Sequence, residues 1–174
     1  MGATTLLSLE EFLNLPDAPG KRELLNGELI SLPPANLSHN MVAKLLFELL
    51  SAVLSTKRVW SETAYQLSSG MLVPDVSVPW PDQRVENDYY QGSPMIAIEI
   101  ASRGNSAHEI ENKTAAYLQD GAAEVWIIYP QLRSMTVSYK DHAIRIAGTY
   151  HCQALGLDVD IASILAAPGE QRYK

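Results

Sequence analysis

Cysteine is almost absent from this chain of 174 residues, and its scarcity excludes two kinds of site. Cys152 is the only cysteine, so the chain can form neither an internal disulfide framework nor a zinc cluster held by thiolates. The histidines, at positions 39, 108, 142 and 151, include no pair spaced by four residues, which argues against a zinc hydrolase. We therefore expect a protein of a reducing compartment.

Long apolar runs are also missing. No stretch approaches the roughly 18 consecutive apolar residues of a membrane span, and no charged start followed by an apolar run marks a signal sequence. We expect a cytoplasmic protein that does not bind a membrane. The sequence has no repeat, low-complexity segment or linker, and 47% hydrophobic with 19% charged residues suits a single domain over residues 1–174.

Positive charge is scarce as well, with 13 lysines and arginines against 20 aspartates and glutamates and a net charge of -7. Because cations hold polyanions, this balance opposes a purely electrostatic hold on nucleic acid. Only the local field at a cleft steers a polyanion, however, and Lys57, Arg58, Arg84 and Arg103 could rim one side of such a cleft. The alternative is that these four residues are dispersed charges that keep the protein soluble.

The apolar pattern changes between strand and helix spacing along the chain. Ser8 and Glu11 have capping-box spacing ahead of a short helix, and Asn26-Gly27 predicts the type I′ turn of a hairpin over 21–32. Further predictions are a long helix from Ser38 to Leu54, a strand over 59–67 followed by a turn at Gly70, a polar loop over 79–94, a strand over 124–129, a meander of 135–139 and 143–147, and a helical turn over 161–165.

Two carboxylates stand in the most apolar part of the sequence. In the segment 73–78 the side chains alternate, so that Asp75 shares a face with Val73 and Ser77, and we expect Asp75 in a core strand. Glu99 lies in the segment 95–102, where the isoleucines at 96, 98 and 100 point to one face and Glu99 points to the other between two alanines. These small neighbours leave room for a ligand beside Glu99.

A lysine follows on a predicted helix of about fourteen residues. Ser106 and Glu109 have capping-box spacing at its start, and Gly121 marks its C-terminal end. Lys113 lies four residues before Tyr117, on the stripe that this helix would bury against the sheet. A lysine in that position needs a partner.

Carboxylates on neighbouring strands can hold a hard divalent cation such as Mg²⁺, together with water and substrate phosphate. Lys113 would then orient or deprotonate the attacking water, or offset the charge that builds on phosphorus, which fits hydrolysis of a phosphodiester. Each feature alone also has a structural explanation. Pro-Asp occurs by chance, a structural arginine can pair a buried glutamate, and Glu109 with Lys113 is an ordinary i,i+4 pair.

Pro74-Asp75, Glu99 and Lys113, in this order, resemble the motif of the PD-(D/E)xK restriction-endonuclease-like superfamily, and more closely its Uma-type endonuclease branch. The resemblance covers nearly the whole chain, including segments 10–12 and 23–28, His39, Glu99 to Ser102, and segment 124–126. It implies a restriction-endonuclease-like core of the α/β (α+β) class, in which helices flank a mixed central β-sheet with an N-terminal hairpin and a C-terminal β-meander.

The resemblance also implies an activity and a site. The chain is expected to be a Mg²⁺-dependent endonuclease that hydrolyses phosphodiester bonds of nucleic acid, with DNA favoured over RNA as the substrate. Mn²⁺ is expected to be able to replace Mg²⁺. Asp75, Glu99 and Lys113 would be catalytic, Asp75 and Glu99 would bind the metal, and His39 and Glu109 would be auxiliary. Similarity to enzymes that act on two strands favours a symmetric homodimer.

The chain departs from the superfamily pattern at the lysine. Glu99-Ile100-Ala101 stands in place of Glu-x-Lys, so the lysine has moved to the following helix, as in the Uma-type branch. The competing hypothesis is a catalytically silent nuclease-like fold that serves as a binding or regulatory dimer. The acidic balance and the lack of basic, aromatic-interleaved patches favour that hypothesis.

Overall fold

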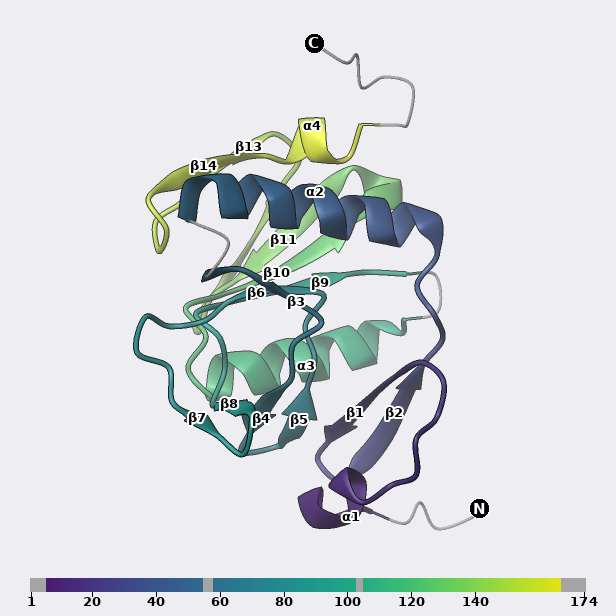
Figure 1. Ribbon diagram of the computed structural model, residues 1–174. Coiled ribbons are helices and arrows are strands. Elements are labelled where there is room, and N and C mark those ends of the chain that lie inside the picture. Colours follow the sequence, from purple (N-terminus) through teal and green to yellow (C-terminus); the bar gives the residue numbers. More distant parts are fainter. Residues whose placement is uncertain (1–5, 55–57, 103–104, 167–174) are drawn as a thin grey trace.

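The structure is a computed structural model that describes residues 6–54, 58–102 and 105–166. Lys57 and Arg103, two of the four cations expected at the rim of a cleft, lie outside these residues. Within the described chain, a mixed sheet has helices on both faces and a second sheet beside it, in agreement with the predicted fold class (Figure 1).

The central sheet has six strands in the order β12-β11-β10-β9-β6-β3. β9 (Ile96–Ile100) and β10 (Glu124–Tyr129) are parallel, and the chain between them forms α3 (Ala107–Gln119), as predicted for a strand–helix–strand unit. The other neighbours are antiparallel, and the predicted meander is confirmed. These strands are β3 (Trp60–Ser61), β6 (Val76–Val78), β11 (Ser134–Ser138) and β12 (Ala143–Ile146).

Side-chain alternation along β9 gives each face of the central sheet its own core. The three isoleucines of β9 belong to the core beneath α2 (Leu37–Leu54), whereas Ala97 belongs with Tyr117 to the core beneath α3 on the opposite face (Figure 1). Glu99 shares the parity of Ala97, so its side chain points toward α3. The predicted alternation thus places a carboxylate on the face that carries Lys113.

The predicted N-terminal hairpin is present. β1 (Lys21–Leu25) pairs with β2 (Glu28–Leu32), and the turn has positive φ angles of 52° at Asn26 and 83° at Gly27. A capping box on Ser8 starts the short helix α1 (Leu9–Leu13), as predicted. The hairpin belongs to a sheet in the order β2-β1-β5-β4-β8-β7. The other strands of this sheet are β4 (Tyr65–Leu67), β5 (Gly70–Leu72), β7 (Val85–Glu86) and β8 (Tyr89–Gln91).

One glycine lets the hairpin approach β5. Gly70 has a φ of 139°, and a Cβ at this position would lie 2.3 Å from the carbonyl oxygen of Leu24. Only a residue without a side chain permits this contact between β1 and β5. It brings Lys21 and Glu23, both on β1, against the segment that leads from β5 to Asp75.

The chain before the central strands differs from the prediction in three details. Residues 59–67 form two strands that pair in different sheets, β3 with β6 and β4 with β5, because the chain breaks at Glu62, whose φ is 48°. Gly70 is the first residue of β5 and not part of the turn. Asp75 does not lie in a strand; it occupies the bend that immediately precedes β6.

Two further strand pairs were not predicted. The polar segment 79–94 contains β7 and β8, which pair with each other although strands of two and three residues are too short to show an alternating pattern. β13 (Thr149–Cys152) and β14 (Leu157–Asp160) form a two-stranded sheet ahead of α4 (Ile161–Ile164), which is the predicted terminal helical turn.

Helix α2 qualifies the expectation about membranes. It is 18 residues long with a mean hydropathy of 1.3, so by length and composition alone it is able to cross a membrane. The core helix of a soluble protein passes the same test, and α2 places Val42, Leu46 and Leu50 in the core over the central sheet. The absence of a membrane partner stays a prediction.

Candidate active site

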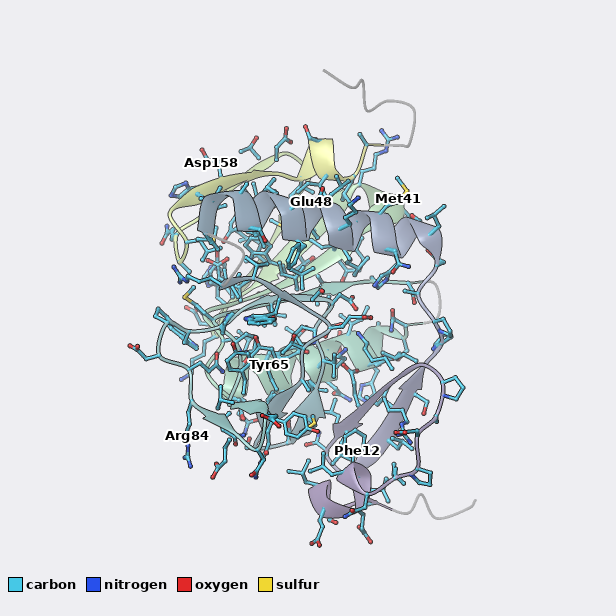
Figure 2. All side chains as sticks on the ribbon, viewed as in Figure 1. Phe12, Met41, Glu48, Tyr65, Arg84 and Asp158 are labelled. Carbon is cyan, nitrogen blue, oxygen red and sulfur yellow. The ribbon has the colours of Figure 1, made fainter. Side chains whose placement is uncertain are left out.

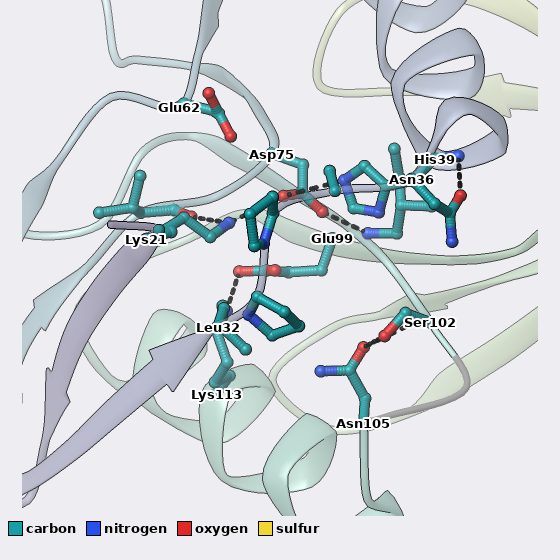
Figure 3. Close-up of a pocket in the computed structure, with 16 residues that line it drawn as sticks. Lys21, Leu32, Asn36, His39, Glu62, Asp75, Glu99, Ser102, Asn105 and Lys113 are labelled. Carbon is teal, nitrogen blue, oxygen red and sulfur yellow. Dashed lines mark hydrogen bonds and ion pairs between the residues drawn. The ribbon is translucent and has the colours of Figure 1, made fainter. Parts of the chain in front are cut away.

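One pocket of about 610 Å³ contains the three residues predicted to be catalytic. Asp75, Glu99 and Lys113 all line the pocket, and so does His39 (Figure 3). The pocket lies between the start of β1, the segment 32–36 that leads into α2, and the C-terminal end of β9. The structure therefore brings the side chains of all three residues to one pocket.

Asp75 is buried and fully engaged. Its Oδ1 accepts a hydrogen bond from Lys21 Nζ at 2.8 Å and lies 3.4 Å from His39 Nε2, and its Oδ2 accepts from the backbone N–H of Ile100 at 2.8 Å. Burial alone would raise the pKa of Asp75, but the hydrogen bond from His39 and the charge of Lys21 outweigh it and hold the pKa well below its usual range. Asp75 is therefore a carboxylate at neutral pH.

Glu99 faces the opposite balance. Its Oε1 accepts from Lys113 Nζ at 2.7 Å and from the Tyr117 hydroxyl at 2.8 Å. Burial raises the pKa of Glu99, Lys113 lowers it, and the nearby charge of Asp75 raises it again, so the net shift is upward. The ionised form of Glu99 is therefore less favourable in the folded protein than in water, chiefly because the carboxyl group is buried.

Lys113 is buried, with 6% of its side chain exposed, and ion pairs hold it on two sides. Its Nζ lies 2.7 Å from Glu99 Oε1 and 3.0 Å from Glu23 Oε2. Burial works to lower the pKa of Lys113, but Glu99 and Glu23 together raise it well above the usual range. Lys113 is therefore an ammonium at neutral pH, which suits it to stabilise negative charge and not to take a proton from water.

The structure adds Lys21 and Glu23, which sequence reasoning did not select. Glu23 is completely buried; its Oε1 accepts from the backbone N–H of Val73 at 2.8 Å and from Lys113. The sequence does contain a signal for these two residues. Lys21 and Glu23 stand at every second position before the core residue Leu25, so all three share one face of the predicted hairpin arm. Charges that share a face with a core residue need buried partners.

The two auxiliary candidates have different positions. His39 lies in the first turn of α2, lines the pocket and contacts Asp75. Glu109 accepts a hydrogen bond from Asn105 Nδ2 at 3.0 Å, and its backbone N–H donates to Ser106, the N-cap of α3. Lys113 pairs with Glu23 and Glu99, so the predicted alternative of an i,i+4 surface pair with Glu109 does not describe its ion pairs.

The expected basic rim has little support in the described residues. Arg84 pairs with Glu86 at 2.9 Å, with 72% of its side chain exposed, and Figure 2 shows it pointing outward from the chain before β7. Neither Arg84 nor Arg58 is among the residues that line the pocket. Among the described residues that line the pocket, the lysines are Lys21 and Lys113.

The donors fit a hard divalent cation. Asp75 and Glu99 offer carboxylate oxygens, and Asp75 Oδ1 with the carbonyl oxygen of Val73 already holds a cation, the ammonium of Lys21, at 2.8 and 2.9 Å. Within the described residues, no group of three or more His, Cys, Asp and Glu side chains is arranged to hold a metal, so the side-chain ligands of such a cation would be these two carboxylates. Such a cation would take the rest of its shell from water and a substrate oxygen, as Mg²⁺ commonly does.

Comparison with known proteins supplies a family and a fold. The family model Uma2, described as "Putative restriction endonuclease", matches residues 9–150. The chain is similar to the crystal structure of "a putative nuclease belonging to DUF820" from Anabaena variabilis, with a TM-score of 0.82, 21% sequence identity and coverage of 92% of this chain and 99% of that one. No curated protein matches the chain. At this identity the structural similarity shows the fold alone.

Proposed function

Because the chain belongs to the Uma2 family, described as putative restriction endonucleases, we propose that it is a divalent-metal-dependent nuclease that hydrolyses phosphodiester bonds of DNA. One observation carries the proposal: Asp75, Glu99 and Lys113 line a single pocket, with two carboxylates and an ammonium arranged around a space large enough for a nucleotide. Two carboxylates that can hold a divalent cation, beside a lysine ammonium, suit hydrolysis of a phosphodiester.

Each protein group has a distinct role in this proposal. Asp75 and Glu99 hold the cation, whose chemistry when bound is to polarise a phosphoryl oxygen and lower the pKa of water. Lys113, which carries a positive charge, stabilises the negative charge that builds on the phosphate. Glu23 and Tyr117 position this pair, since Glu23 contacts the Lys113 ammonium and Tyr117 donates to Glu99.

The acidic balance of the chain favours a second candidate. A net charge of -7, together with an exposed Arg84 that already pairs with Glu86, fits a nuclease-like fold that binds a partner without turnover. The cytoplasmic location and the homodimer also remain predictions. Light scattering tests the dimer, and a monomer at micromolar concentration would contradict it.

The direct test is digestion of labelled single- and double-stranded DNA and RNA with Mg²⁺ or Mn²⁺. The parent is compared with Glu99→Gln, which removes a proposed metal ligand, and with Glu111→Gln, which changes an exposed glutamate of the same helix as Lys113. We expect metal-dependent cleavage, strongest on DNA, by the parent and by Glu111→Gln only. Equal cleavage by Glu99→Gln, or no cleavage of any substrate by the parent, would reject the proposal.

A further inference from the structure

The ammonium of Lys21 contacts oxygen atoms that a metal ion at the site would be expected to bind. Its ammonium lies 2.8 Å from Asp75 Oδ1 and 2.9 Å from the carbonyl oxygen of Val73. A carboxylate oxygen beside a backbone carbonyl is the kind of donor set that a hard cation uses. Figure 3 shows the Lys21 side chain reaching into the pocket toward Asp75, with Glu99 close by.

The charge of Lys21 acts on both proposed metal ligands. Its Nζ contacts Asp75 directly and Glu99 lines the same pocket, so the ammonium lies in the electrostatic field of both carboxylates. Lys21 is therefore the direct counterion of Asp75 in the metal-free protein, whereas Lys113 is that of Glu99.

The two lysines of the pocket are held differently. Lys113 contacts two carboxylates and has 6% of its side chain exposed, whereas Lys21 contacts one carboxylate and one carbonyl and has 16% exposed. Lys21 is also the first residue of β1, beside the pocket-lining Gly20. It is the less enclosed of the two and the easier to displace.

We propose that Lys21 is a resident counterion that a divalent cation must displace from Asp75 before the site is loaded. The proposal rests on the proposed function, because it takes Asp75 and Glu99 as the metal ligands. A dipositive ion at these oxygens repels an ammonium a few ångströms away, so the two cations exclude each other. Lys21 thereby weakens metal binding while it keeps the metal-free carboxylates compensated.

The test is the affinity for Mn²⁺, measured by isothermal titration calorimetry without nucleic acid. We compare the parent with Lys21→Met, which keeps the length and removes the charge, and with Lys21→Arg, which keeps the charge. Lys140→Met, at an exposed turn between β11 and β12, is the matched control for loss of one lysine. Glu99→Gln reports whether binding occurs at the proposed site.

We expect Lys21→Met to bind Mn²⁺ about tenfold more tightly than the parent, since one cation no longer competes. Lys21→Arg and Lys140→Met should retain the parent affinity. The melting temperature of Lys21→Met in EDTA should fall, because Asp75 loses its partner, and Mn²⁺ should raise it by more than it raises that of the parent. Lys21→Gln replaces Lys21→Met if the latter does not fold.

Two failures are distinguishable. If Glu99→Gln abolishes binding but Lys21→Met binds no more tightly than the parent, Lys21 is only a structural partner of Asp75 and the inference is overturned. If the parent and Glu99→Gln bind Mn²⁺ equally well, the ligands are elsewhere, and the proposed function fails together with the inference that rests on it.

Discussion

Glu99 and Glu124 are both carboxylates on neighbouring strands of the central sheet, yet their surroundings differ in kind. Glu124 pairs in register with Ile96, three residues before Glu99, and points to the opposite face. It is buried, and its donors are neutral: Trp126 Nε1 and the Tyr150 hydroxyl, each at 2.7 Å, and the Cys152 thiol at 3.6 Å. Glu99 instead contacts an ammonium and lines a pocket.

The comparison separates a structural carboxylate from a candidate ligand. Glu124 ties β10 to Tyr150 and Cys152 of β13, so its donors hold the C-terminal hairpin on the sheet. Asp75 and Glu99 instead pair with the ammonium groups of Lys21 and Lys113, and the two carboxylates line the same pocket. Burial of an acidic residue alone therefore does not mark a site; a second carboxylate, charged partners and access to a pocket do.

The largest expected effect comes from Lys113, and it would break the comparison if it were absent. Lys113→Met should lower the rate of cleavage by about 10² to 10⁴, the usual span for loss of a positioned charge-stabilising group, while Mn²⁺ binding survives. Steady-state cleavage measured beside Glu124→Gln, which should retain activity, provides the contrast. Equal losses in both variants would show that the two regions do not differ in function.

The same substitution leaves Glu23 and Glu99 buried without their ammonium, which should destabilise the protein by about 3 to 5 kcal/mol. The double variant Glu23→Gln with Lys113→Met separates folding from catalysis. It should recover much of the stability, measured by urea unfolding, and none of the activity. Recovery of activity in the double variant would contradict a chemical role for Lys113.

Metal should stabilise one region only. At a hundredfold excess over its dissociation constant, Mg²⁺ or Mn²⁺ should stabilise the parent by about 2.7 kcal/mol, because it binds the folded site and not the open chain. Glu99→Gln should show no such gain. Since burial and Asp75 raise the pKa of Glu99, its charge is costly in the fold, and metal-free Glu99→Gln should be as stable as the parent or slightly more so.

Thermal melting of both proteins in EDTA and in metal measures these differences. Equal shifts of the two melting temperatures would place the metal elsewhere. Strong destabilisation of metal-free Glu99→Gln would make Glu99 a structural partner like Glu124, and the two regions would then be alike.

Glu124→Gln should have a moderate effect on stability and none on the site. The substitution keeps one acceptor oxygen but replaces charge-assisted hydrogen bonds from Trp126 and Tyr150 with neutral ones, and its amide group needs an acceptor beside Cys152. We expect a loss of about 2 kcal/mol in the free energy of unfolding, measured in urea and unchanged by added metal. A loss that added metal reverses would link Glu124 to the pocket.

Much of this architecture could be predicted from the sequence, because local patterns control it. The turn at Asn26-Gly27, the apolar spacing of α2 and the alternation around Glu99 each involve residues close in the chain. The match to the Uma2 family confirms the resemblance that the order of Asp75, Glu99 and Lys113 suggested.

The rest depends on contacts between distant segments. Lys21 lies 54 residues from Asp75, and Glu23 lies 90 residues from Lys113, so no local spacing announces either pair. Asp75 was assigned to a strand because its neighbours alternate, but β5 and β6 enter different sheets and the chain must bend between them. The sequence does not predict β7 and β8, because strands of two and three residues are too short to show an alternating pattern.

The smallest predicted effect sharpens the comparison through pH. Burial, followed by the nearby Glu124 carboxylate, raises the pKa of the Cys152 thiol from 9.0 to about 12. Because the folded-state pKa lies above the unfolded one, the stability that the thiol contributes is fully present below pH 9 and is lost as pH rises toward 12. At pH 10 the loss should be about 1 kcal/mol.

Urea unfolding of the parent and of Cys152→Ala, under reducing conditions, should therefore give a difference that shrinks by this amount between pH 8 and pH 10. Asp75 has a lowered pKa, so its contribution is lost only as pH falls through its folded-state pKa, and the difference between the parent and Asp75→Asn should stay constant over the alkaline range. A difference for Cys152→Ala that also stays constant would mean that the folded protein ionises this thiol as readily as the unfolded chain does. Glu124 would then not be enclosed by the buried, neutral donors that distinguish it from Glu99 in the pocket.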